Sequence, residues 1–147
     1  MGLGELLRDY PNALRIRADG VRAPRVPTGW PDGDRLPVVL IPGIYESWHF
    51  LRGIGAALHD DGHPVHVVAS IGRNARPIPW VAAQVRALMD ARDLRDAVIV
   101  GHSKGGIVGK HLLVEELGVA EAERRIRHLV AIASPFAGSS MARLAPV

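Results

Sequence analysis

The chain has 147 residues, enough for one domain, and 48% of them are hydrophobic, which allows a buried core. Its net charge of +3 comes from 18 basic and 15 acidic residues that are interspersed, so no nucleic-acid-binding surface is expected. The sequence has no cysteine for a disulfide or a thiolate metal site. Because it shows neither a signal peptide nor a membrane span, a cytoplasmic protein is expected.

The chain divides into two parts by composition. Residues 1–36 are rich in proline and arginine and predict a loop-rich lead-in, with a short helix near Leu3–Arg8 and a short strand near Leu14–Arg17. A regular alternation of apolar runs and helical patterns begins afterwards. Residues 37–147 are therefore expected to form the folded domain.

Four short apolar runs predict the strands of this domain. They lie at residues 38–41, 65–68, 98–100 and 129–132, and each is rich in β-branched residues. Such near-continuously apolar runs are typical of strands that are buried on both faces. Their starts are about 30 residues apart, the size of a βαβ unit, so a parallel sheet is predicted.

The segments between these strands predict helices. One is capped by Ser47 and runs to about His59, one has Pro79 in its first turn, one runs from Ser103 to a capping Gly118, and a short one covers 120–125. Alternating strands and helices indicate an α/β fold, a parallel sheet with helices on both faces.

The turn after the third strand carries the main chemical signal. It reads Gly101-His102-Ser103-Lys104-Gly105, a Gly-x-Ser-x-Gly pattern between a strand and a helix. The serine needs a turn so tight that a Cβ at either glycine would collide, which explains Gly101 and Gly105. Ser103 is therefore predicted to be a nucleophile, raised above the sheet at the N-terminus of a helix.

The loop after the first strand predicts the second part of an acyl-transfer site. It reads Ile41-Pro42-Gly43-Ile44-Tyr45. In a serine hydrolase with this strand–turn–helix pattern, an oxyanion is held by one backbone N–H from this loop and one from the residue after the serine. The expected donors are Ile44 (or Tyr45) and Lys104.

Residues 38–140 resemble the bacterial lipases and esterases of the α/β-hydrolase superfamily. The likeness rests on Leu40–Gly43, Gly72-Arg73-Asn74, Gly101–Gly106 and Ala133–Phe136. It implies an α/β-hydrolase fold, a Ser-Asp-His triad, a small-molecule or lipid ester substrate, and neither cofactor nor metal. One departure is Pro42, where many lipases have a histidine before the glycine.

The sequence does not supply the rest of a triad. No aspartate follows Ser103, His111 lies too far along the third helix, and His128 precedes the fourth strand. The domain is therefore expected to be truncated after that strand, with an aspartate and a histidine on later strands of a longer chain. This 147-residue chain alone is then expected to be inactive, and its bare fourth strand to self-associate edge to edge.

Two questions stay open from the sequence alone. Tyr45, Trp48 and His49 are candidates for the substrate pocket, although core packing explains them as well, and a substitute dyad of His49 with Glu46 is a weaker alternative. The primary expectation is a serine esterase or lipase. A non-catalytic relative that binds ligands or partners, and an acyltransferase or thioesterase on the same scaffold, are the other two.

Overall fold

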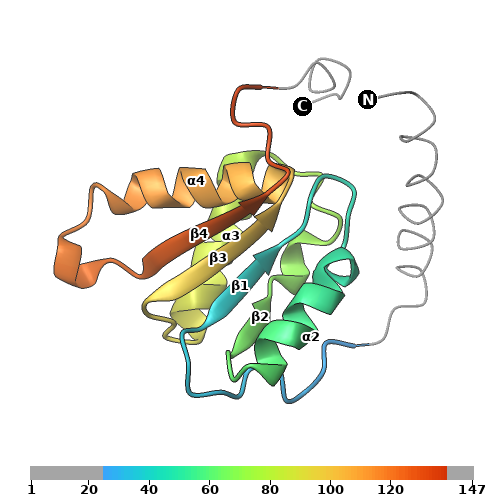
Figure 1. The fold of residues 1–147 in the computed structure, drawn as a ribbon. Coiled ribbons are helices and arrows are strands. Elements are labelled where there is room, and N and C mark those ends of the chain that lie inside the picture. Colours follow the sequence, from blue (N-terminus) through green and yellow to red (C-terminus); the bar gives the residue numbers. More distant parts are fainter. Residues whose placement is uncertain (1–24, 139–147) are drawn as a thin grey trace, which may run out of the picture.

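The computed structural model describes residues 25–138, and the helix and strand expected near residues 3–8 and 14–17 lie outside them. Its centre is a sheet of four parallel strands in the order β2-β1-β3-β4 (Figure 1). The strands are β1 Val38–Ile41, β2 Val65–Val67, β3 Ala97–His102 and β4 Ile126–Ile132. The predicted parallel sheet is confirmed.

The position of β1 explains its composition. Val38 pairs with both Val65 of β2 and Val98 of β3, so β1 has a strand on each side. All four of its side chains are buried, because alternate residues enter the cores on opposite faces of the sheet. Val39 packs in one core and Leu40 in the other.

Helices cover both faces of the sheet, as expected (Figure 1). Their bounds are η1 Trp48–Leu51, α2 Arg52–Asp60, η2 Ala69–Ile71, α3 Ile78–Ala91, α4 Lys104–Glu116 and η3 Glu121–Glu123. The helices α3 and α4 share one core through Val81, Val85 and Leu112. On the other face, Leu51 and Trp30 pack with the strands, so the segment before β1 also contributes to a core.

Three helix features differ from the prediction. Ser47 makes no capping bond, and the helix expected after it is divided into a 3-10 turn and α2. Gly118 does not cap α4 in a left-handed conformation. The short helix expected at residues 120–125 is only the 3-10 turn η3.

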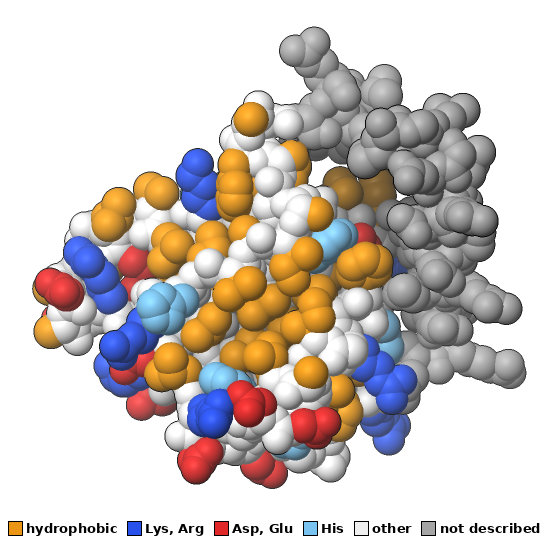
Figure 2. Space-filling model, in the orientation of Figure 1, with side chains coloured by type: hydrophobic (Ala, Val, Ile, Leu, Met, Phe, Trp, Pro, Cys, Tyr) orange, Lys and Arg blue, Asp and Glu red, His pale blue; other side chains and the backbone are white. Residues whose placement is uncertain are grey.

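The strand β4 lies at one edge of the described sheet and is largely exposed. It begins at Ile126, three residues earlier than predicted, so it contains Arg127 and His128. Val130 is 48% exposed. Figure 2 shows hydrophobic side chains exposed across the centre of the face that carries α2. None of the helices within residues 25–138 is long and apolar enough to span a membrane.

Candidate functional site

The strand order places two loops next to each other at the carboxyl edge of the sheet. From β1 the chain passes through α2 to β2 on one side, whereas from β3 it passes through α4 to β4 on the other. The chain therefore leaves these adjacent strands in opposite directions. Open parallel sheets bind ligands at such a point. The loop after β1 and the turn after β3 meet there.

The turn after β3 has the strained geometry that its sequence predicts. Ser103 has φ 50° and ψ −118°, a conformation that is costly for a residue with a side chain. A Cβ on Gly101 would lie 2.5 Å from the carbonyl carbon of Gly105, and a Cβ on Gly105 would overlap the carbonyl oxygen of Ile41. Both glycines are therefore required by backbone contacts, and the start of α4 packs directly on the end of β1.

A backbone hydrogen bond fixes the position of Ser103. Its N–H donates to the carbonyl of Ile132 at the end of β4, at 2.8 Å. Ser103 lies immediately before α4, so it is next to the unpaired N–H groups of the first helical turn. The side chain is partly exposed, and the hydroxyl has no hydrogen-bond partner within residues 25–138.

The loop after β1 is a tight turn. The Glu46 N–H donates to the Gly43 carbonyl at 3.2 Å, and Tyr45 within the turn has φ 60°. The Gly43 N–H donates to the Glu46 side chain at 2.7 Å. In the part of the chain that the structure describes, the Ile44 N–H donates to no acceptor. Lys104, the first residue of α4, also has a backbone N–H that the helix cannot pair.

A buried carboxylate joins this loop to the turn after β3. Glu46 Oε2 lies 2.8 Å from Nδ1 of His102 as well as accepting the Gly43 N–H. The His102 ring in turn packs on Phe50, with ring centroids 4.5 Å apart. The weaker sequence alternative paired Glu46 with His49; in the structure Glu46 Oε2 lies beside His102 Nδ1, and His49 Nδ1 lies 3.0 Å from the Ser47 hydroxyl.

The loop after η2 supports the same edge from the other side. Asn74 is fully buried with φ 51°, and its side-chain amide donates to the Pro42 carbonyl at 2.6 Å. The Lys104 ammonium donates to the carbonyls of Asn74 at 2.8 Å and of Arg76 at 2.5 Å. Burial lowers the pKa of Lys104 below its ordinary value. Asn74 and Lys104 thus bind protein backbone.

Comparisons with known proteins agree with this architecture. The family model described as the alpha/beta hydrolase fold matches residues 37–145. The chain belongs to the α/β-hydrolase family. A search of curated proteins found no match.

A solved structure shows the same fold. It is reported as an "Extracellular alpha/beta-hydrolase from Paenibacillus species" that "shares structural and functional homology to Tobacco Salicylic Acid Binding Protein 2". The TM-score is 0.53 at 23% sequence identity, and the match covers 68% of this chain. It covers 41% of the Paenibacillus chain, so the present chain spans less than half the length of that α/β-hydrolase.

The three pocket candidates of this α/β-hydrolase have different surroundings. Tyr45, in the loop after β1, is 48% exposed. Trp48 packs edge to face on Trp30, with ring centroids 5.5 Å apart, and joins the core on the α2 face. His49 stacks on Trp48 at 3.8 Å. Core packing therefore accounts for Trp48, whereas Tyr45 is left accessible to a ligand.

The histidines and glutamates after Ser103 form contacts elsewhere in this α/β-hydrolase. His111 and Arg86 both pair with Glu115 on the outer surface of α4. Glu116 accepts the Arg125 N–H at 2.6 Å. His128 lies within β4, paired in register with Val98 in the amino-terminal part of the sheet. Within residues 25–138, none of these groups contacts the Ser103 hydroxyl.

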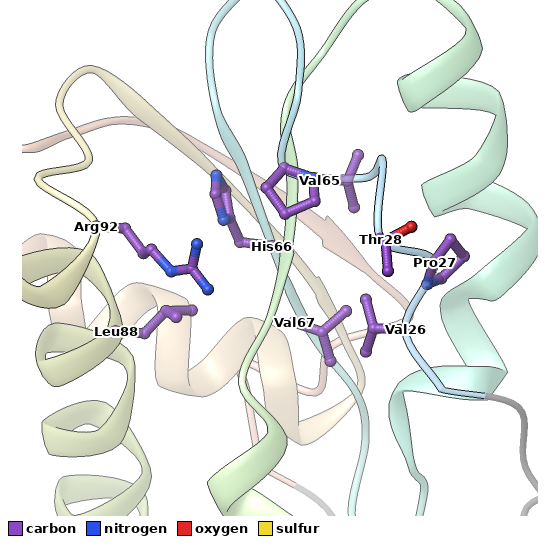
Figure 3. Close-up of a pocket in the computed structure, with 9 residues that line it drawn as sticks. Val26, Pro27, Thr28, Val65, His66, Val67, Leu88 and Arg92 are labelled. Carbon is purple, nitrogen blue, oxygen red and sulfur yellow. The ribbon is translucent and has the colours of Figure 1, made fainter.

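A hollow of about 310 Å³ lies beside the edge strand β2 (Figure 3). Its lining is mainly apolar, with His66 of β2 and Arg92 at the end of α3 as its charged or titratable members. Burial, and next the Arg92 charge, lowers the pKa of His66 below 6.5. The residues of this hollow do not include Ser103 or the loop after β1.

Glu46, His102 and Asn74 are the site residues whose contacts the sequence did not predict. Glu46 lies three residues after Gly43, the spacing at which a side chain can bond back to a backbone N–H at a turn. That spacing was a usable signal. The contact of His102 with Glu46 had no such signal in the sequence, because the two residues are 56 positions apart along the chain.

Proposed function

We propose that the protein is a serine hydrolase of carboxylic esters, of the esterase or lipase type, with Ser103 as its nucleophile. The observation that supports this most is the backbone of Ser103, which has a positive φ between β3 and α4, directly beside the loop after β1. The same turn with an inert serine would gain nothing from a strain of about 1–3 kcal/mol.

In this proposal the Ser103 Oγ attacks the ester carbonyl and forms a new C–O bond, while its proton passes to a base. The carbonyl oxygen becomes an oxyanion, which the Ile44 and Lys104 N–H groups stabilise. Collapse of this intermediate breaks the bond to the alcohol, which takes the proton and leaves an acyl-enzyme. Water then releases the acid by the same steps.

The base and its acid are proposed to come from outside the described residues. Within residues 25–138, His102 makes no hydrogen bond to the Ser103 hydroxyl and the glutamates of α4 pair with other groups, so none of them is proposed as the base. The proposed substrate is a small-molecule or lipid ester, because Tyr45 offers an exposed apolar surface in the loop after β1, which meets the turn after β3. No cofactor takes part in these steps.

Covalent labelling tests the proposal. In the full-length protein, a fluorophosphonate should modify Ser103, and Ser103→Ala should abolish both labelling and hydrolysis of p-nitrophenyl esters, by at least about 10³-fold. Ser134→Ala is a matched control, because Ser134 is a nearby serine whose hydroxyl lies 3.4 Å from the carbonyl oxygen of Ile132. Labelling that persists in Ser103→Ala, or that maps to another serine, would show that the assignment is wrong. A folded wild-type protein without labelling or turnover would favour the non-catalytic relative.

A further inference from the structure

We infer that Glu46 is a positioning residue that sets the distance between the two oxyanion donors, by binding the loop after β1 to the turn after β3. This inference rests on the proposed function. Glu46 itself contacts neither Ser103 nor a reacting atom; it acts through Gly43 and His102.

The geometry of the carboxylate supports this role. Its side chain is only 8% exposed, and a buried carboxylate is costly unless it is well hydrogen-bonded. A single oxygen, Oε2, receives the Gly43 N–H at 2.7 Å and lies 2.8 Å from His102 Nδ1. Both bonds exist together only when the loop and the turn lie in one relative position.

The contacts of Gly43 decide which amides remain for the oxyanion. Its N–H is occupied by Glu46, so Gly43 is not a donor, and Ile44 or Tyr45 must supply the donor from this loop. A Cβ on Gly43 would lie 2.7 Å from Glu46 Oε2 and 3.1 Å from His102 Nδ1. The absence of a side chain at Gly43 is therefore what lets the carboxylate reach both partners.

The loop has a second, independent attachment. Asn74 donates to the Pro42 carbonyl, and the Lys104 side chain connects the start of α4 to the Asn74 carbonyl. These bonds hold the loop near the sheet without Glu46. Loss of Glu46 should therefore shift the Ile44 N–H relative to the Lys104 N–H rather than unfold the edge. Displacements of about 1 Å lower rates by about 10²-fold.

Three variants and one control separate positioning from simple stabilisation. Glu46→Met keeps the length and removes the acceptor; Glu46→Gln keeps one oxygen acceptor. The double variant Glu46→Met/His102→Phe replaces the carboxylate and the imidazole with apolar groups; it should regain part of the stability that Glu46→Met loses, although the Gly43 N–H still lacks its acceptor. Glu123→Met, at an exposed glutamate in η3, is the control.

Two readouts are measured on the full-length protein. Amide hydrogen exchange of Gly43, followed by NMR, should be about 10- to 100-fold faster in Glu46→Met than in the control. For p-nitrophenyl ester hydrolysis, kcat should fall about 10- to 100-fold with KM unchanged, and Glu46→Gln should recover most of it. The double variant should melt at a higher temperature than Glu46→Met and keep the low kcat.

Two results would overturn the inference. Slow Gly43 exchange and a control-like kcat in Glu46→Met would exclude a positioning role, and so would a double variant that recovers both stability and kcat. If the wild type neither hydrolyses esters nor reacts with a fluorophosphonate, the proposed function fails separately. The exchange rate of Gly43 in Glu46→Met then decides alone whether Glu46 fixes the loop.

Discussion

Gly105 illustrates how one backbone position connects the sheet to the site. An added Cβ would overlap the Ile41 carbonyl oxygen and lie 2.7 Å from its carbon and 2.8 Å from the Pro42 carbonyl oxygen. These are backbone atoms of the central strand and its loop, so they cannot move aside as a flexible side chain can. Any side chain at this position must separate α4 from β1.

Gly105→Ala should therefore lower the free energy of unfolding by about 1–3 kcal/mol, since steric overlap in a packed region costs about that much. Gly53→Ala is the matched control, because a Cβ there meets no atom within 4 Å and alanine favours a helix. That variant should leave stability unchanged or raise it by up to about 1 kcal/mol. Urea unfolding followed by circular dichroism measures both. Equal stabilities for the two variants would contradict the packing of α4 on β1.

Single residues were predictable where local backbone geometry dictates the residue type. Ser103, Gly101 and Gly105 follow from the demands of one tight turn, and the structure has that turn. The contact between Glu46 and His102 depends instead on the register of β1 against β3, which no local pattern encodes. The same reason applies to Asn74, which is fully buried and donates to the Pro42 carbonyl 32 residues away along the chain.

At the scale of elements, helix ends were less predictable than helix existence. The Ser47 hydroxyl lies beside His49 Nδ1 instead of capping a helix, so the helical segment after Ser47 begins with a 3-10 turn. At the end of α4, Arg124 donates to the Glu116 and Val119 carbonyls at 3.1 and 3.3 Å. These bonds satisfy the helix end without a left-handed glycine. In both cases, side-chain contacts replaced the expected cap.

The strand β2 should make stability depend on pH. Burial and then Arg92 lower the pKa of His66, so the folded protein binds its proton less readily than the unfolded chain does. The contribution of His66 to the free energy of unfolding is therefore fully present above pH 6.5, the ordinary pKa of histidine. It is lost as the pH falls through the lower pKa of His66 in the folded protein.

Urea unfolding at several pH values between 5 and 8 measures this effect. His66→Gln should make the loss of stability on acidification smaller, and Arg92→Met should do so to a lesser degree, because its charge is the smaller cause. If the wild type and His66→Gln lost equal stability between pH 7.5 and 5, His66 would not be responsible. The hollow in Figure 3 would then have no role in the acid response.

At the scale of the whole molecule, the parallel α/β architecture and its helices on both faces were predictable from the spacing of apolar runs. The exposure of β4 could not be predicted in this way, because its apolar residues form a run that is typical of a buried strand. In the structure only Ile126 of β4 is fully buried. Its unpredicted first residues include Arg127, which pairs with Asp96 at 3.3 Å and adds charge to one end of the edge.

The exposed part of β4 should cause the 147-residue chain to self-associate. An edge strand presents unpaired backbone groups, and Val130 adds exposed apolar surface. Sedimentation velocity should show dimers or larger species that increase with concentration. Val130→Lys should reduce them, since an edge lysine opposes strand pairing. Leu117→Lys adds the same charge at an exposed position after α4 and should not. A chain that is monomeric at every concentration would contradict the prediction.

The strand order also has a consequence for synthesis at the ribosome. The chain completes β1 and β2 early, and these strands can pair as soon as β2 has emerged, since Val38 and Val65 are partners. Val38 meets its other partner, Val98, only after α3 has emerged. The two halves of the proposed active site are thus translated far apart, and closing so long a loop is entropically costly. A nascent chain stalled before Ala97 would present the completed β1 edge without its partner β3, a surface suited to a chaperone.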